Sequence, residues 1–295
     1  MDRKYLPVVP AAVLRRYKVA QPFDTRFRAC ARLLQSLWRE KQGLAVGTCA
    51  HPAGKSYRLG SMITAKDGEM GRNFMTPAIA QFAWRELAYR EPGALIDERR
   101  LSTNLLSSMP LTFNLLGPWQ LDTKLATAIL RNLDSQFHDA NVEMIAFEHS
   151  PGRGNPTFTG DYTAFDAMIA YSRPNNIMGF IAIEVKYSES AGEPKQELKP
   201  RYNEIAPSAG LHRDPASSLL CKGNLQQFFR QHILAQTLLG GKGWDEGHFV
   251  VIAPRLNLPM QAAIAGYRAH LNPLTKDQVA FDSWSLEDVI DQFRV

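Results

Sequence analysis

The sequence contains little that would indicate a disulfide-bonded, zinc-binding or membrane protein. Its 295 residues include three scattered cysteines, Cys30, Cys49 and Cys221, and no CxxC pair. A disulfide framework and a structural zinc site are therefore not expected, and a reducing cytoplasmic location is favoured. No apolar run approaches the ~20 residues that a membrane helix needs, so no membrane partner is expected. The N-terminus has charges at both ends of a broken apolar stretch, which does not resemble a secretory signal.

Several catalytic and nucleotide-binding motifs are also missing. No GxGxxG opens a helix after a strand, and neither GxSxG nor HExxH occurs. These absences argue against a dinucleotide-binding enzyme, an α/β-hydrolase and a zinc protease. Apolar residues make up 45% of the chain and aromatic residues 10%, which is enough to form a folded core.

The positive charge is concentrated near the N-terminus. The net charge of the chain is +5, yet residues 1–60 contain 12 Lys and Arg against 3 Asp and Glu. This section therefore carries +9, and the other residues together carry −4. Such asymmetry indicates a polyanionic partner that binds to one part of the chain, or else a solvated basic surface.

Apolar spacing predicts a mainly helical N-terminal section, residues 1–120, followed by a core, residues 121–295, that combines strands and helices. Helices are predicted at 25–42, 76–90, 121–138, 217–239 and 258–271, with a last helical turn or two after residue 284. Strands are predicted at 142–149, 163–172, 179–188, 248–255 and 279–284. This order predicts the α/β class, with a mixed β-sheet flanked by helices on both faces.

The predicted strands 163–172 and 179–188 carry unexpected charges. Asp166 shares a strand face with apolar residues, and Glu184 and Lys186 share a face that begins apolar. The intervening SRPNN sequence is a strong turn signal, and its Asn175 is the midpoint between Asp166 and Glu184. A symmetric hairpin would place the two carboxylates opposite each other, with Lys186 one step along the same face.

Two adjacent carboxylates in apolar surroundings repel each other unless a cation lies between them. Their hard oxygen ligands favour Mg²⁺, or Mn²⁺ in its place, which would bind to Asp166 and Glu184. Such an ion polarises a phosphoryl oxygen and activates water, while a nearby lysine orients that water and offsets charge on the phosphate. The alternative is a solvated strand face with a cross-strand salt bridge, but the apolar neighbours argue against it.

At these residues the sequence resembles the PD-(D/E)XK nuclease superfamily, whose pattern is an Asp, a hairpin and then Glu-x-Lys. Further phrases resemble a bacterial subgroup of predicted restriction endonucleases; they are NLLSSMPLTFNLLGP (104–118), FEHSPGR (147–153), TGDYTAFDAMI (159–169) and IEVKYSE (183–189). The resemblance implies a restriction-endonuclease-like fold, metal binding by Asp166 and Glu184, and a Lys186 that serves the attacking water. Phe165 stands where the superfamily name has Pro, a departure shared by many members.

The resemblance also implies accessory catalytic residues. Glu148, at the end of the first predicted strand, is the best upstream candidate, although a surface carboxylate paired with Arg153 is an equal alternative. On the helix after the Glu-x-Lys strand the candidates are Gln226 and Gln227, between which the sequence does not choose. Asp161, in a glycine-rich loop, is a weaker candidate.

Two further segments have both a nucleic-acid interpretation and a structural one. The stretch 104–118, with its scattered Asn and Ser residues, would either contact a phosphate backbone or cap the helix 121–138. The long loop 189–216 carries Lys195, Lys199, Arg201 and Tyr202, and would either grip a strand or remain a solvated loop.

The sequence therefore predicts a Mg²⁺-dependent endodeoxyribonuclease of the restriction type, with DNA as its partner and the basic N-terminal section holding the DNA backbone. A homodimer would suit cleavage of two strands, but no interface is evident. Two alternatives are a nucleic-acid-binding protein that keeps the nuclease fold without cutting, and a metal-dependent enzyme that acts on a small molecule.

Overall fold

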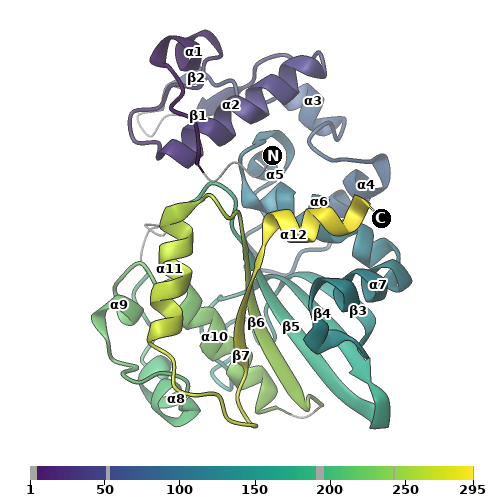
Figure 1. Ribbon diagram of the computed structural model, residues 1–295, viewed down its shortest axis with the longest axis vertical. Coiled ribbons are helices and arrows are strands. Elements are labelled where there is room, and N and C mark those ends of the chain that lie inside the picture. The colour runs from purple at the N-terminus through teal and green to yellow at the C-terminus, as the bar shows by residue number, and fades with distance from the viewer. Residues whose placement is uncertain (1–4, 51–53, 191–195, 242, 295) are drawn as a thin grey trace.

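The structure, a computed structural model, describes residues 5–50, 54–190, 196–241 and 243–294 (Figure 1). Its helices are α1 Ala11–Arg16, α2 Arg26–Lys41, α3 Ala65–Glu69, α4 Pro77–Ala88, α5 Glu98–Thr103, α6 Ser108–Leu121, α7 Thr123–Leu133, α8 Arg201–Ala209, α9 Ser218–Cys221, α10 Gln226–Leu239, α11 Leu258–Ala269 and α12 Leu286–Asp291. Its strands are β1 Thr48–Ala50, β2 Ser56–Arg58, β3 Asn141–His149, β4 Phe165–Arg173, β5 Ile177–Val185, β6 Glu246–Ala253 and β7 Ala280–Ser285. Short 3₁₀ turns occupy Ser135–Phe137, Pro174–Asn176 and Gln292–Arg294.

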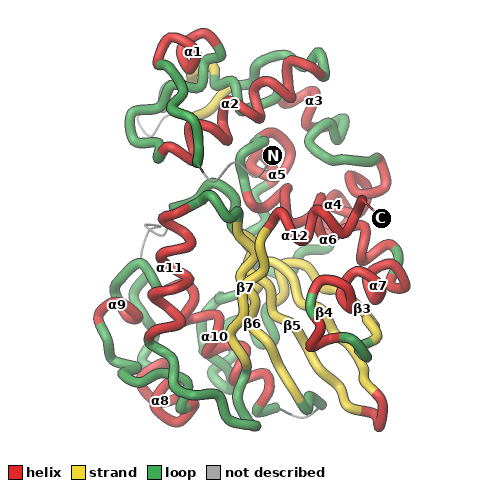
Figure 2. The backbone as a smooth tube through the Cα atoms, in the orientation of Figure 1, coloured by secondary structure: helices red, strands yellow, loops and turns green. Residues whose placement is uncertain are grey.

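The central element is a five-stranded mixed sheet in the order β3-β4-β5-β6-β7 (Figure 2). Strands β3, β4 and β5 are antiparallel neighbours, whereas β5, β6 and β7 run parallel. This arrangement confirms the predicted mixed sheet. The parallel strands return through the helices that follow β5 and β6, as parallel connections require.

The β4–β5 hairpin has the predicted symmetry. Its turn contains Asn175 in the left-handed region at φ 66°, a conformation that asparagine tolerates better than most residues. Pairing runs from Arg173↔Ile177 at the turn to Ala167↔Ile183, and this register puts Asp166 next in line with Glu184. The sequence midpoint therefore identified the correct strand pairing.

Two apolar layers cover the two faces of the sheet, and helices form the outer side of each (Figure 1). On one face, Ile181 and Ile183 of β5 belong to the same core as the buried residues of α4, α6 and α7. On the other face, Phe180 and Ala182 pack with α8, α10 and α11. Since Glu184 continues the second set at two-residue spacing, it faces α10, and the predicted division of the strand faces is confirmed.

The stretch 104–118 forms most of α6, which neither predicted alternative anticipated. Trp119 is fully buried and Phe113 is 3% exposed, so α6 is a core helix. Its own N-cap is Ser107, whereas Asp122 caps α7 by accepting from the amides of Lys124 and Leu125. A helix buried on most of its sides lacks the amphipathic spacing by which helices are predicted, which explains the omission.

The helix predicted at 217–239 is broken between α9 and α10. A Cβ atom at Gly223 would lie 2.4 Å from the carbonyl oxygen of Leu219 and 2.5 Å from its Cα atom, so only glycine fits this close approach. The break makes Gln226 the first residue of α10 and Gln227 the second. Both candidate glutamines therefore lie at a helix start, beside the carboxyl end of β5.

Part of the predicted long loop 189–216 forms the helix α8, Arg201–Ala209. Tyr202 is 1% exposed and donates to Asp161 at 3.0 Å, while Arg201 is bound to Glu204. These contacts bury or pair two of the side chains proposed to grip a strand, and Lys195 lies outside the described residues. A buried tyrosine needs a partner for its hydroxyl, and here that partner fixes α8 against the core.

The N-terminal section holds α1, α2 and α3 together with the small β1–β2 hairpin, at the upper end of the molecule in Figure 1. Part of its positive charge serves this local structure. Arg39 is 6% exposed and donates to the backbone of Gly60 and Leu44, and Arg32 is paired with Asp24 at 2.6 Å. The remaining exposed cations of this section are therefore fewer than the sequence suggested.

The predicted boundary at residue 120 falls within α6, whose Trp119 packs in the same core as the sheet. The division into 1–120 and 121–295 stays a prediction. Within the described residues, no helix has the length and apolarity needed to cross a membrane.

Candidate active site

The carboxylate of Asp166 lies at the point where β4 and β5 stop pairing. The last paired residues are Ala167 and Ile183, and the next free amide of β5, that of Val185, donates to Asp166 Oδ2 at 2.8 Å. The Asp166 side chain thus replaces the backbone of β4 as the acceptor. Its other oxygen, Oδ1, has no hydrogen-bond donor among the described residues, and Asp166 lines the cavity described below.

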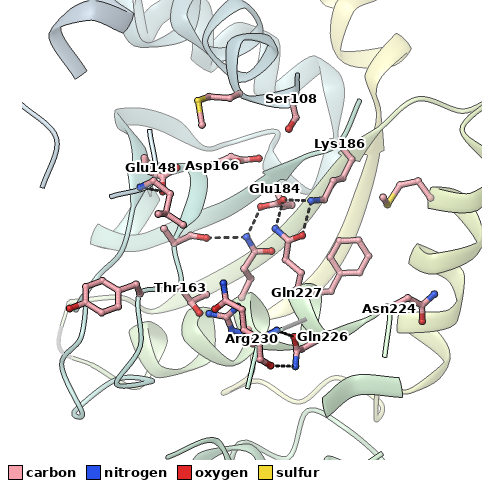
Figure 3. Close-up of a pocket in the computed structure, with 18 of the residues that line it drawn as sticks. Ser108, Glu148, Thr163, Asp166, Glu184, Lys186, Asn224, Gln226, Gln227 and Arg230 are labelled. Atoms are coloured by element: carbon pink, nitrogen blue, oxygen red, sulfur yellow. Dashed lines mark hydrogen bonds and ion pairs between the residues drawn. The ribbon is translucent and has the colours of Figure 1, made fainter. Parts of the chain in front are cut away.

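Glu184 and Lys186 meet one step further along the sheet, where Figure 3 shows them pointing toward each other. Lys186 Nζ lies 2.7 Å from Glu184 Oε1, and the two residues are 4% and 3% exposed. Gln227 of α10 joins them: its Nε2 donates to Glu184 Oε1 and its Oε1 accepts from Lys186 Nζ, each at 2.7 Å. A buried charge needs such partners, because burial removes its hydration.

Gln231 was not identified from the sequence, yet it contacts the same carboxylate. Its Nε2 donates to Glu184 Oε2 and, at 3.0 Å, to the carbonyl of Ala164. Its Oε1 is buried and has no hydrogen-bond partner among the described residues. The available signal was its position four residues after Gln227, which places both side chains on one face of α10.

Glu148 ends β3 at the same edge of the sheet and lines the same cavity. Its backbone is left-handed at φ 46°, an uncommon conformation for a glutamate, and Oε1 accepts from the amide of Leu95 at 3.3 Å. Burial raises the pKa of Glu148, and the charge of Glu184 raises it further. Arg153 donates to the backbone oxygen of Glu148 and pairs with Glu91, so within the described residues no ion pair neutralises the Glu148 carboxylate directly.

The remaining candidates have other partners. Gln226 lines the cavity, but its amide accepts from the amide of Gln196 at 3.0 Å and donates to the carbonyl of Gln196 at 2.7 Å, pointing away from Glu184 (Figure 3). Asp161 is 7% exposed and bound to Arg230 and Tyr202. The structure therefore brings Asp166, Glu184 and Lys186 together with Gln227, and leaves the side chain of Gln226 outside this group.

The grouped side chains open into a cavity of about 290 Å³. Its wall includes Glu148, Asp166, Glu184 and Lys186 from the sheet side, Gln227 and Gln231 from α10, and the guanidinium-bearing residues Arg100 and Arg230. A polar cavity with carboxylates on one side and guanidinium groups at its margin suits an anionic substrate that is brought to a cation-binding centre.

The electrostatics of the cavity favour a divalent cation. Burial raises the pKa of Asp166 well above its usual range, and the charge of Glu184 adds to this effect, against the opposing influence of Lys186 and the Val185 amide. No group of three or more His, Cys, Asp or Glu residues is arranged as a metal site in the described part of the chain. Mg²⁺, however, needs only one or two protein carboxylates and keeps several waters.

The residues present thus fit a hard divalent cation. Asp166 offers Oδ1. Either oxygen of Glu184 becomes a ligand when the cation replaces a glutamine amide or the Lys186 ammonium as its partner. In the arrangement seen here, the Lys186 ammonium supplies the positive charge beside Glu184. Cation binding would relieve the repulsion between the two carboxylates and release Lys186 toward the cavity.

Comparison with known proteins gives one family. The model of the PD-(D/E)XK nuclease superfamily matches residues 22–295. No curated protein and no solved structure matches the chain. The match covers both the N-terminal section and the sheet that carries Asp166, Glu184 and Lys186, and this chain belongs to the PD-(D/E)XK nuclease superfamily.

Proposed function

We propose that the protein is an endonuclease that hydrolyses phosphodiester bonds in DNA with the help of Mg²⁺ or Mn²⁺, as a restriction endonuclease does. The observation that carries this proposal is the convergence of Asp166, Glu184 and Lys186 in one cavity at the open end of the β4–β5 hairpin. Membership of the chain in the PD-(D/E)XK nuclease superfamily supports phosphodiester hydrolysis as the reaction. The substrate, the cation and the endonucleolytic mode are part of the proposal.

Asp166 and Glu184 would hold the cation, which when bound polarises a phosphoryl oxygen and lowers the pKa of a water molecule. Lys186 would orient the attacking water and offset charge on the phosphate. Gln227 holds the Lys186 ammonium at 2.7 Å and would keep it aimed at the cavity. Glu148, whose pKa is raised, would accept a proton from the water.

The role of the helix glutamine is assigned to Gln227 ahead of Gln226. Gln227 contacts both members of the Glu184–Lys186 pair, whereas Gln226 holds the segment at Gln196. A direct catalytic role for Gln226 stays a prediction, with no contact to the charged groups in its support.

The test is cleavage of closed circular DNA, because an endonuclease linearises or nicks it and an exonuclease does not act on it. We expect cutting in the presence of Mg²⁺ or Mn²⁺, none with a chelator, and a loss of at least about 10²-fold in Asp166→Asn, Glu184→Gln and Lys186→Met. Glu143→Gln, on the exposed side of β3, is the control and should cut normally.

Wild-type protein that binds DNA and never cuts it under these conditions would overturn the proposal in favour of a nuclease-fold binding protein. Equal cutting by Asp166→Asn, Lys186→Met and wild type would mean that the activity does not arise at this site. Absence of both binding and cutting would favour a small-molecule substrate.

A further inference from the structure

A second cavity, of about 450 Å³, lies next to the first. It is lined by Arg28 and Arg32 of α2, Tyr57 of β2, and Asn104 between α5 and α6. Arg100 and Ser190 line both cavities, so the two share a wall. The N-terminal section and the sheet therefore lie on either side of this shared wall, and the first cavity contains the carboxylates.

The second cavity has an excess of positive charge. Three arginines and one acidic residue, Glu189, line it, and Asp24 pairs with two of these arginines. Asp24 binds Arg32 at 2.6 Å and lies 3.4 Å from Arg28 Nε. That Nε atom is buried, but 39% of the Arg28 side chain is exposed and the residue lines the cavity.

Arg100 is fixed at the junction of the cavities. Its Nε donates to Ser107 Oγ at 2.7 Å, and its Nη2 lies 3.4 Å from Ser108 Oγ and 3.7 Å from Glu189 Oε1. Glu189 is itself held by the amides of Ser108 and Tyr187. The Arg100 Nη1 atom has no acceptor in the described part of the chain, and 45% of the side chain is exposed.

A guanidinium that is anchored on one side and open on the other is preorganised to bind an anion. Phosphates of one strand follow each other at about 3.4 Å along the axis of a duplex. An adjoining cavity lined by guanidinium groups therefore suits the phosphates next to one that lies at the carboxylates. The junction at Arg100 is such a place.

We propose that the second cavity binds the sugar–phosphate backbone of the nucleic acid on one side of the bond that is cut, with Arg100 on the phosphate at the junction and Arg28 on the next part of the strand. This inference rests on the proposed function, because it takes a nucleic acid as the substrate. In this proposal the N-terminal section contributes to DNA binding through Arg28 of α2, which lines the second cavity, and not through the general basic charge of residues 1–60.

The experiment measures the affinity of metal-free protein for a labelled DNA duplex by fluorescence anisotropy at several salt concentrations. The variants are Arg28→Gln and Arg100→Gln, which remove charge but keep a hydrogen-bond donor. Lys276→Gln is the control, because this exposed lysine lies between α11 and β7, at the opposite end of the molecule from β1 and β2 (Figure 1). Thermal melting of each variant establishes that it is folded.

We expect each arginine variant to lower the slope of log affinity against log salt by about 0.9, and to bind about tenfold more weakly near 0.1 M salt, whereas the control keeps the wild-type slope. Slopes that stay the same in both arginine variants, or a wild type without salt-dependent DNA binding, would overturn the inference. Since no metal is present, binding and cutting are separate readouts. If the arginine variants show the expected slope change but the wild type never cuts, only the proposed nuclease activity is refuted. If the wild type cuts but the slopes of the variants do not change, only the proposed role of the second cavity is refuted.

Discussion

The Nζ atom of Lys186 lies 2.7 Å from the Oε1 atom of Glu184, with both side chains almost fully buried. Removing one partner of a buried ion pair leaves an uncompensated charge. In this site the same ammonium that is proposed to serve the water also neutralises a proposed cation ligand. Stability and function are therefore linked at Lys186, and the following predictions separate them.

Lys186→Ala should destabilise the protein when no divalent cation is present. Loss of one partner of a buried pair typically costs about 3–5 kcal/mol, and the remaining donors Gln227 and Gln231 favour the lower end. Urea unfolding in chelator measures the effect, with the exposed Lys124→Ala as control. Added Mg²⁺ should restore part of the loss, and equal midpoints for both variants in chelator would contradict the ion-pair argument.

Asp166→Asn should abolish cutting and raise stability by about 1 kcal/mol in the absence of metal. The asparagine keeps an oxygen for the Val185 amide but removes the charge that burial and Glu184 disfavour. Thermal melting with and without Mg²⁺ tests this prediction. The wild type should gain stability from the cation and the variant much less, since ligand binding stabilises only a protein with an intact site. A variant that melts below the wild type in chelator would show that the Asp166 charge is not destabilising.

Gln227→Ala and Gln226→Ala form a matched pair of neighbours. Residues that orient a metal ligand or its partner typically change activity by about 10- to 100-fold, and Gln227 contacts both Glu184 and Lys186. Gln226→Ala should affect the turnover number less, since this amide binds Gln196 and the carbonyl of Cys221. Steady-state cleavage kinetics measure the turnover numbers of the two variants. A larger decrease in the Gln226 variant would indicate that Gln226, and not Gln227, acts at the site.

A buried histidine pair predicts loss of stability in mild acid. His212 Nε2 and His232 Nδ1 both contact the hydroxyl of Tyr267, at 2.9 and 3.0 Å, and burial lowers the pKa of His212 to about 3 and that of His232 to about 4. Both values lie below the ~6.5 of an unfolded histidine, so the folded state binds fewer protons. Stability is present above about pH 6.5 and falls as the pH drops toward 4, by up to about 1.4 kcal/mol per pH unit for each group.

The window between pH 6.5 and 5 is the most informative, because most carboxylates titrate lower, and the shifted pKa values of Asp166, Glu148 and His149 are shared by all the proteins compared. Urea unfolding across that range should show a shallower pH dependence in His232→Gln than in the wild type. The exposed His138→Gln should retain the wild-type dependence. Parallel curves for all three proteins would mean that the histidine pair does not control the acid response.

The charged strand pair was predictable because a hairpin has simple geometry. One tight turn at Asn175 fixes the register, and the two-residue period of a strand then fixes the shared face of Glu184 and Lys186. Helix contributions were harder to predict. The distance of Gln227 from Glu184 depends on the interruption between α9 and α10 at Gly223. Whether Gln227 or Gln226 faces Glu184 depends on the rotation of α10 about its axis, which sequence spacing does not determine.

The structural use of charge was also hidden in the sequence. Arg39 and Arg32 counted toward a basic surface, although one is buried against the backbone and the other is paired with Asp24. Tyr202 was expected in a loop that either grips a strand or is solvated, but it is buried and donates to Asp161. Such pairings join residues that are distant along the chain, and no local pattern reveals them.

Two hydrogen bonds join the side-chain amide of Gln226 to the backbone of Gln196. They connect the segment before α8 to the start of α10. Gln196 lines the cavity, and Gln226 begins the turn of α10 that carries Gln227. A ligand that displaced the Gln196 segment would have to break both hydrogen bonds. The first residue of α10 thus ties the Gln196 segment to the same helix whose Gln227 and Gln231 hold the Glu184 carboxylate.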